Sequence, residues 1–250
     1  MKILASDYDG TLNVGGTVSK ENIEAIQKWR AAGNLFGMVS GRNLGSLKKF
    51  MEKDNVPYDF LVGCNGAVIT DAEGNAVGDV CVSPRMVKML LREIHRFEAH
   101  YVSASYDWGS TPAEADSDIR ADDSVLMIDG VRVGRVYQVS GYYTCPEHAL
   151  SVRNACEALF PGQIKGLMPS PQGIDFVRVG TNKAEGIRSL VRNRGIEPEI
   201  ILTVGDGEND LSMLEAPDFC GYAMQSAMPV VLERVSRTTK SVAALIEEFL

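Results

Sequence analysis

Residues 2–14, KILASDYDGTLNV, begin as an apolar run and then hold two aspartates, Asp7 and Asp9, directly before Gly10 and Thr11. A short apolar run of this kind predicts a buried strand. Carboxylates seldom lie inside strand cores, because burying an unpaired charge is costly in free energy. Side chains two positions apart in an extended segment point to the same side, so Asp7 and Asp9 can face one site together. The stretch therefore predicts a first strand that ends on a pair of acids.

The segments that follow alternate between helix and strand. Ser19 precedes an amphipathic helix that Gly33 ends, and the next apolar segment reads as a strand ending at Ser40. A helix is expected over about 43–53, and residues 58–70 predict a third strand and the start of a hairpin. This order favours a parallel sheet with helices on both of its faces.

The middle of the chain has a different pattern. We expect a helix over 83–100 and one over 146–160, with short strands over 101–108, 124–129, 134–143 and 173–179. From residue 181 the first pattern returns, with a helix over 181–195, a strand over 199–205, a helix over 211–214, a strand near 219–224 and a last helix ending at Leu250. The sequence therefore predicts an α/β fold: a Rossmann-like parallel-sheet core of residues 1–82 and 181–250, interrupted by an inserted α+β domain of residues 83–180.

Composition limits the possible functions. The chain has 250 residues, of which 45% are hydrophobic and 23% are charged, and a net charge of −8. No cluster of Lys and Arg offers a basic face, so we expect no nucleic-acid partner. No apolar run approaches the roughly 20 residues of a membrane span, and the N-terminus is unlike a secretory signal, so we expect a cytoplasmic protein without a membrane partner. Five cysteines without a CxxC pair favour reduced thiols over disulfides or a zinc site.

Four polar clusters follow the predicted strands or begin a predicted helix. They are Asp7, Asp9 and Thr11; Ser40 and Arg42; Lys183; and Asp206, Asn209 and Asp210. Ligands of open parallel sheets bind outside the carboxyl ends of the strands, so these clusters are expected to converge on one edge. Several carboxylates in one place repel strongly, by about 4 kcal/mol per pair at 4 Å and an effective dielectric of 20. A cation must offset this repulsion, and an oxygen-only ligand set without Cys or His favours Mg²⁺.

Taken together, the motifs DYDGT, SGR, TNKAEG and GDGENDLSML resemble the four motifs of the haloacid dehalogenase (HAD) superfamily, in order and at suitable spacings. The insert after the third strand, with CNGA before it, is similar to the C2-capped branch, the Cof-like or subclass IIB phosphatases. This resemblance implies an HAD-type core with a C2-type cap that selects the substrate. It also implies a Mg²⁺-dependent phosphatase that hydrolyses phosphate monoesters of small metabolites, with sugar phosphates as the expected class.

The resemblance also implies roles for individual residues. Asp7 would be the nucleophile that forms an aspartyl phosphate, Asp9 the general acid and base, and Lys183 the cation that stabilises the developing charge. The implied metal ligands are Asp7, the backbone carbonyl of Asp9, and Asp206, with Asp210 holding metal-bound waters or Lys183. The implied phosphate- or substrate-binding residues are Thr11, Ser40, Gly41, Arg42 and Asn209.

Other interpretations stay open at this point. Asp7 and Asp9 could be turn formers before Gly10, Asp210 a plain helix-start acid, Ser40 a helix cap, and Arg42 a structural group. A phosphosugar mutase of the same fold and a non-catalytic protein that binds a phosphorylated metabolite are the alternatives to a phosphatase. The aromatic segments 106–108 and 142–143 could contact a leaving group or pack in the cap. For the oligomeric state, a monomer or a homodimer is expected.

Overall fold

The computed structural model describes residues 1–106 and 108–250. It divides into two compact units, which are described separately. The first consists of Met1–Arg42, Ser46–Gly78 and Asn182–Leu250, and the second of Asn43–Gly45 and Asp79–Thr181. The sequence placed the two boundaries between residues 82 and 83 and between 180 and 181, a few residues from these positions.

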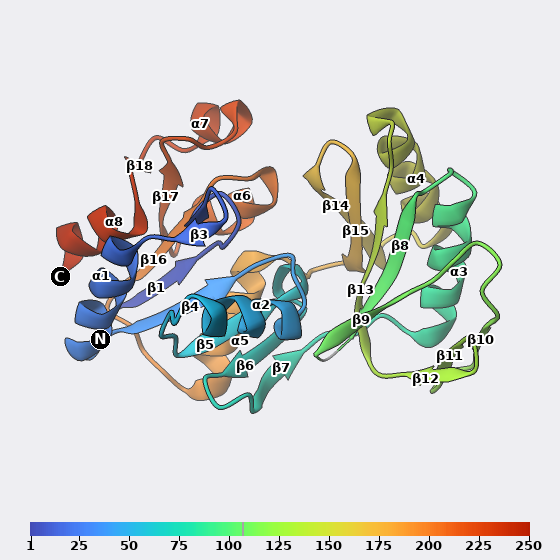
Figure 1. The fold of residues 1–250 in the computed structure, drawn as a ribbon, viewed down its shortest axis with the longest axis horizontal. Coiled ribbons are helices and arrows are strands. Elements are labelled where there is room, and N and C mark those ends of the chain that lie inside the picture. The colour runs from blue at the N-terminus through green and yellow to red at the C-terminus, as the bar shows by residue number, and fades with distance from the viewer. Residues whose placement is uncertain (107) are drawn as a thin grey trace. The chain divides into compact units, whose positions relative to one another are not determined.

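An eight-stranded sheet forms the centre of the first unit, in the order β18-β17-β16-β1-β4-β5-β6-β7 (Figure 1). Its strands are β1 (Ile3–Ser6), β4 (Leu35–Val39), β5 (Phe60–Gly63), β6 (Val68–Asp71), β7 (Ala76–Asp79), β16 (Ile201–Gly205), β17 (Cys220–Met224) and β18 (Thr238–Thr239). The strands run parallel from β18 to β5, and β6 is antiparallel to β5. Central β1 is buried at every residue, which is why its sequence is continuously apolar up to Ser6.

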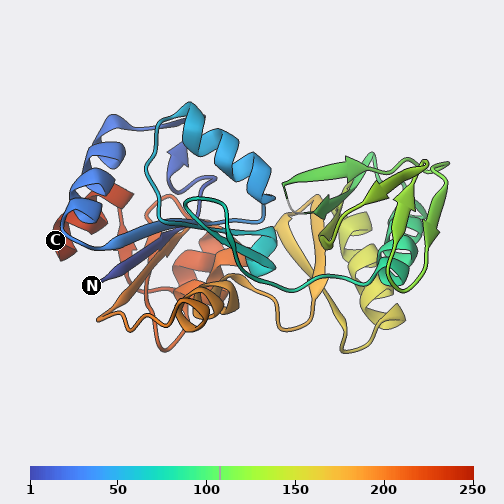
Figure 2. The same ribbon diagram turned by 90° about the horizontal axis from the view of Figure 1, so that it is seen from below.

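Helices cover both faces of this sheet. The helices of the unit are α1 (Lys20–Ala31), α2 (Leu44–Lys53), α5 (Lys183–Arg194), α6 (Leu211–Leu214), α7 (Pro229–Arg234) and α8 (Val242–Phe249). Blue α1 packs beside red α8 on one face, and orange-brown α5 lies on the other (Figure 2). A short hairpin, β2 (Asn13–Val14) with β3 (Thr17–Val18), follows β1. The predicted parallel sheet with two covered faces is therefore observed.

Local sequence signals fix the ends of α5. The Asn182 side chain accepts a hydrogen bond from the backbone N–H of Glu185 and caps the N-terminus. Gly195 ends the helix in the left-handed conformation, at a φ of 60°, which glycine adopts without a steric penalty. The cap makes Lys183 the first helical residue, so its side chain projects from the helix end that lies nearest the carboxyl ends of the strands.

The second unit combines two antiparallel sheets with two helices. A five-stranded sheet has the order β14-β15-β13-β8-β9, and a three-stranded sheet the order β10-β11-β12. The strands are β8 (Tyr101–Tyr106), β9 (Gly109–Pro112), β10 (Ile119–Ala121), β11 (Leu126–Ile128), β12 (Val131–Val133), β13 (Val136–Tyr142), β14 (Ile164–Ser170) and β15 (Gly173–Arg178). Helices α3 (Pro84–His95) and α4 (Pro146–Leu159) lie side by side (Figures 1 and 2), and their apolar faces form the core of this unit with the sheet.

Several elements differ from the sequence expectation. The helix expected over 83–100 ends at His95, and the chain takes a left-handed φ of 59° at Glu98 soon afterwards. Strand β14 was missed because Gly166 and Pro169 interrupt its apolar pattern, and helix α7 was missed because the β-branched pair Val230 and Val231 after Pro229 does not favour a helix. Strands β10 and β12, three residues each, are too short to show an alternation. Among the described residues, no helix has both the length and the apolar character required to cross a membrane.

Candidate active site

The polar clusters predicted from the sequence lie at one edge of the first unit's sheet. Asp7 follows β1, Ser40 follows β4 and Asp206 follows β16, and these three strands are neighbours in the sheet. Lys183 begins α5, and its Nζ atom reaches the same edge. Residues nearly 200 positions apart in the chain thus meet where a parallel sheet presents its ligands.

Lys183 is the centre of a buried group of charges. It has no exposed surface, and its Nζ donates a hydrogen bond to Asp7 Oδ1 at 2.6 Å and another to Asp210 Oδ1. The second oxygen of Asp210, Oδ2, accepts the backbone N–H groups of Asp206 at 2.9 Å and Gly207 at 2.8 Å. Asp210 therefore holds Lys183 and the loop that carries Asp206 in place at the same time.

Asp206 completes a cluster of three carboxylates. One oxygen each of Asp7, Asp206 and Asp210 lies within 4.8 Å of the others. Asp206 Oδ1 accepts a hydrogen bond from the Thr11 hydroxyl at 2.7 Å. Gly10, at a φ of 81°, leaves the room that Asp206 occupies, because an added Cβ atom would overlap this carboxylate. The DGT part of the first motif thus shapes the space around the acid of the fourth motif.

The cluster carries three carboxylates against a single ammonium group. Burial, and then the charges of Asp210 and Asp206, raise the pKa of Asp7 well above its ordinary value, although Lys183 opposes the shift. Burial and Asp210 likewise raise the pKa of Asp206, against the hydrogen bond from Thr11. For Lys183, burial alone would lower the pKa, but Asp210 and Asp7 outweigh it and raise the pKa. Lys183 therefore stays charged, and the remaining negative charge favours a further cation.

Asp9 lies in a different environment from Asp7. Its side chain is 51% exposed and forms a two-fold ion pair with Arg42, with Nε at 2.6 Å from Oδ2 and Nη2 at 2.9 Å from Oδ1. The Arg42 guanidinium also lies over the ring of Phe50, 4.9 Å from its centroid. Arg42, expected either to bind phosphate or to have a structural role, is thus held by Asp9 and Phe50 in this structure.

The predicted phosphate-binding residues have mixed surroundings. Ser40 is buried, and its Oγ accepts the backbone N–H of Arg42 at 3.3 Å, across the half-buried Gly41. Thr11 is fully buried against Asp206. Asn209 donates from Nδ2 to Asn65 Oδ1 at 3.2 Å. Asn65 was not among the predicted site residues, although the Asn-Gly pair that ends the third strand is a local signal for a tight turn.

The aromatic segments of the second unit divide between core and surface. Tyr143 is buried, whereas Trp108 and Tyr142 are more than a third exposed. Tyr106 packs partly buried against the core of the unit. Asp107, the remaining residue of this group, lies outside the described residues.

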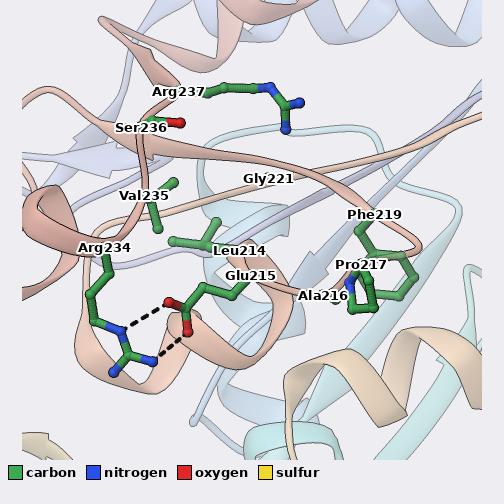
Figure 3. Close-up of a pocket in the computed structure, with 10 residues that line it drawn as sticks. All are labelled: Leu214, Glu215, Ala216, Pro217, Phe219, Gly221, Arg234, Val235, Ser236 and Arg237. Atoms are coloured by element: carbon green, nitrogen blue, oxygen red, sulfur yellow. Dashed lines mark hydrogen bonds and ion pairs between the residues drawn. The ribbon is translucent and has the colours of Figure 1, made fainter.

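A separate pocket of the first unit has a volume of about 450 Å³ and lies around the loop after α6 and the segment between α7 and β18 (Figure 3). Leu214 and Phe219 line it, and Arg234 forms an ion pair there with Glu215, at 2.9 Å from Nε to Oε1. None of the sequence-predicted site residues lines this pocket, so it is distinct from the candidate active site.

Comparisons with known proteins bear on this geometry. Residues 4–244 match the family model described as haloacid dehalogenase-like hydrolase. A 5-amino-6-(5-phospho-D-ribitylamino)uracil phosphatase of Bacillus subtilis, YwtE, is 24% identical over 96% of this chain and 93% of its own. The structure of a haloacid dehalogenase-like hydrolase from B. subtilis superimposes with a TM-score of 0.84 at 19% identity, over 100% of both chains. The HAD subclass IIB sugar phosphatase BT4131 superimposes with a TM-score of 0.76 at 20% identity, over 99% of this chain and 97% of its own.

The chain belongs to the haloacid dehalogenase superfamily, in its Cof-like branch, and is an enzyme of the phosphatase class. The predicted family, fold class and enzyme class are thereby confirmed. Phosphatases of this superfamily generally use a divalent metal ion, and the three clustered carboxylates are hard oxygen donors of the kind that such an ion prefers.

Proposed function

We propose that the enzyme is a Mg²⁺-dependent phosphatase that hydrolyses phosphate monoesters of small metabolites through an aspartyl-phosphate intermediate. The observation that carries the proposal is the contact of 2.6 Å between the buried carboxylate of Asp7 and the ammonium of Lys183, with Asp206 alongside. Burying an unpaired carboxylate costs free energy. The ammonium of Lys183 pairs with one oxygen of Asp7 and so orients the other oxygen for attack on a phosphorus atom.

In this proposal Asp7 and Asp9 divide the chemistry. One Asp7 oxygen attacks phosphorus, the ester bond to the leaving oxygen breaks, and Asp9 gives its proton to that oxygen. Asp9 then takes a proton from the water that attacks the aspartyl phosphate, which restores Asp7 and releases inorganic phosphate. The ammonium of Lys183 stabilises the negative charge on the transferring group throughout. The exposed position of Asp9 supports its role, because the attacking water can reach its carboxylate.

The donor set supports a metal site on Asp7 and Asp206, together with the backbone carbonyl of Asp9. Asp206 has one oxygen that accepts from Thr11, which leaves the other for a ligand bond. Asp210 instead holds Lys183 and two backbone N–H groups, so we assign it to positioning rather than to direct ligation. When bound, Mg²⁺ would neutralise charge on the phosphate and on the carboxylates around it.

For the substrate we propose the phosphate ester of a polyhydroxylated alcohol, with sugar phosphates first. Support comes from the two relatives, one named for a phosphoribitylamino compound and the other for sugar phosphates. We assign the choice of substrate to residues 83–180 as a cap. Its sheet holds a buried polar group, in which Gln138 donates to Ser140 at 3.1 Å and Ser140 donates to Asp175 at 2.7 Å. Such polar groups suit hydroxyl-rich ligands.

For the partners, location and oligomeric state of the protein we keep the expectations from the sequence as proposals. The net charge of −8 supports the absence of a nucleic-acid partner. A cytoplasmic location, the absence of a membrane partner and a monomeric or homodimeric state are kept as predicted from the sequence.

The decisive experiment measures phosphate release from a panel of phosphorylated sugars, sugar alcohols and other small metabolites, with Mg²⁺ or with a chelator. We expect release that needs Mg²⁺ and is abolished in Asp7→Asn. Asp218→Asn is the matched control, because this exposed carboxylate pairs with Arg188 away from the cluster. An isomer assay on the same sugars is run in parallel. Isomer formation without phosphate release would contradict hydrolysis and indicate a phosphosugar mutase. Binding of a phosphorylated metabolite without any turnover would indicate a non-catalytic binding protein.

A further inference from the structure

The turn at the carboxyl end of β5, Cys64–Gly66, has an unusual backbone. Cys64, Asn65 and Gly66 all take left-handed φ values, of 50°, 56° and 102°. Residues other than glycine rarely adopt this conformation, and it persists only where surrounding contacts determine it. Cys64 and Asn65 are both almost fully buried, so solvent does not supply those contacts.

The turn touches the loop of the second motif through its backbone. The N–H of Asn65 donates to the carbonyl of Ser40 at 2.9 Å, and the N–H of Cys64 donates to the carbonyl of Arg42 at 2.8 Å. These two bonds fix the segment that carries Ser40 and Arg42. The two bonds also influence the position of Asp9, because the guanidinium of Arg42 donates two hydrogen bonds to the Asp9 carboxylate.

The same turn supports the helix that carries Lys183. A Cβ atom added at Gly66 would overlap the carbonyl oxygen of Asn182, and one added at Gly186 would lie 2.8 Å from Gly66 Cα. The first turn of α5 therefore rests directly on the backbone of the turn. Any displacement of Gly66 would move Lys183 relative to Asp7, which it contacts at 2.6 Å.

The fourth motif is reached through the Asn65 side chain. Its Oδ1 accepts a hydrogen bond from Asn209 Nδ2 at 3.2 Å. Asn209 adjoins Asp210, whose carboxylate holds Lys183. Asn65 thus contacts the second motif through its backbone N–H and the fourth motif through its side-chain amide. The neighbouring Gly66 packs against α5, the helix that begins with Lys183 of the third motif.

We propose that Asn65 is a positioning residue of the active site, which sets the distance of Lys183 from Asp7 and the orientation of Asn209 without itself reacting. Asparagine suits both requirements, because it tolerates the left-handed backbone and supplies an acceptor oxygen. The proposal rests on the proposed function for its kinetic consequence, but the geometry can be tested without turnover.

The kinetic test compares Asn65→Gly with Asn65→Asp in hydrolysis of 4-nitrophenyl phosphate with Mg²⁺. Asn65→Gly keeps the backbone conformation and removes only the side chain, and we expect kcat to fall about tenfold or more from misplaced groups. Asn65→Asp keeps an acceptor for Asn209 but buries an added charge, so it should lose less kcat than Asn65→Gly while unfolding at a lower temperature than the wild type. The double variant Asn65→Gly with Asn209→Ala should have nearly the same kcat as Asn209→Ala alone, because both changes remove the hydrogen bond between these two side chains.

Asn55 provides a matched control, since it also takes a left-handed φ, of 53°, but is exposed near the end of α2. Asn55→Ala and Asn65→Ala both strain a left-handed position and should both lower the unfolding temperature. Only the change at Asn65 should lower kcat when turnover is measured well below that temperature. A kcat of Asn65→Gly within twofold of the wild type, whatever its stability, would overturn the positioning role.

Amide hydrogen exchange separates this proposal from the phosphatase proposal. In Asn65→Gly we expect faster exchange at the amides of Cys64, residue 65 and Asp210, and no such change in Asn55→Gly. If the wild type hydrolyses no phosphate ester, the proposed function fails, and exchange alone decides the role of Asn65. Unchanged exchange at these three amides would overturn the positioning role whether or not the wild type turns over.

Discussion

Asp7 and Asp9 lie two residues apart, yet they occupy opposite environments. Asp7 is buried and held by the fully buried Lys183, within a group that also includes Asp210 and Asp206. Asp9 is half exposed and pairs with Arg42, which is itself 39% exposed. Two acids of one motif have thus been separated into an inner and an outer ion pair.

The difference suits two kinds of chemistry. A nucleophile needs a fixed direction of attack, and a buried network with few alternative rotamers supplies it. A group that acts first as acid and then as base must be reached by both the leaving oxygen and the attacking water, and a side chain accessible to water allows this. The proposed roles of Asp7 and Asp9 follow this division, and each of the following predictions tests one side of it.

The largest effect is expected from Lys183→Met, which removes the only cation of the inner group. It leaves the buried carboxylates of Asp7 and Asp210 without their ammonium partner, so the free energy of unfolding should fall by about 3–5 kcal/mol in chelator. Urea unfolding measures this loss, and added Mg²⁺ should restore part of it by neutralising the same carboxylates. Lys20→Met is the control, because its exposed pair with Glu24, at 3.6 Å, contributes about 1 kcal/mol at most. Equal losses in the two variants would contradict the view of a buried, mutually dependent group.

Local patterns in the sequence predict the location of this group but not its pairing, although the family resemblance named Lys183 as one of two possible partners of Asp210. Acids placed directly after apolar runs, at Asp7 and Asp206, predicted the carboxyl edge of the sheet, because parallel strands end together. No local pattern indicates that Asp210 bonds to Lys183, 27 positions earlier, or that Thr11 bonds to Asp206, 195 positions later. Such contacts depend on how α5 and the neighbouring strands pack in three dimensions.

The second unit shows the same limit more strongly. Its long helices α3 and α4 were predicted, because an apolar stripe over twelve or more residues is a clear signal. Its short strands β10 and β12 and the polar group of Gln138, Ser140 and Asp175 were not, because they arise from cross-strand neighbours. The unit to which we assign the choice of substrate is therefore the part of the fold least visible in the sequence.

The outer pair is tested by Asp9→Asn. This variant keeps the size of the side chain but can no longer donate or accept the transferred proton, so kcat should fall about a hundredfold or more. The free energy of unfolding should change by less than about 1 kcal/mol, because the lost ion pair is exposed. A large loss of stability with little loss of kcat would reverse the contrast with Lys183→Met and would make Asp9 a structural residue.

The inner pair also predicts a dependence of stability on pH. Burial, followed by the charge of Asp210, raises the pKa of Asp7 in the folded chain. A raised carboxyl pKa stabilises the fold below the unfolded value, and that contribution disappears as the pH rises through the folded value. In chelator, the wild type should therefore lose stability relative to Asp7→Asn as the pH rises above about 4, the ordinary pKa of an aspartate in an unfolded chain.

Asp218→Asn should show a slope of the opposite sign and of smaller size. The hydrogen bond from Arg188 lowers the pKa of Asp218, which is largely exposed. A lowered carboxyl pKa stabilises the fold above the unfolded value, and this contribution is lost as the pH falls. Urea unfolding of the wild type and both variants measures the two slopes, that of Asp7 above about pH 4 and that of Asp218 below about pH 4. Slopes of the same sign would mean that the charge on Asp7 is already balanced without a metal ion.

The smallest effect is expected from Arg42→Lys, which keeps the charge of the outer pair but removes the planar fork that holds both Asp9 oxygens. If Arg42 only balances charge, lysine should replace it fully. If it orients Asp9, as its stacking on Phe50 indicates, kcat should fall by roughly twofold to tenfold, since one of two directional hydrogen bonds is lost.

Arg234→Lys is the matched control, because Arg234 also forms a two-fold, half-exposed pair, with Glu215, away from the catalytic edge. Both variants should keep the free energy of unfolding within about 1 kcal/mol of the wild type, so a change in kcat confined to Arg42→Lys would assign orientation of Asp9 to this residue. An unchanged kcat in Arg42→Lys would show that the outer pair needs only a nearby positive charge, and that the geometry of the site resides in the inner pair alone.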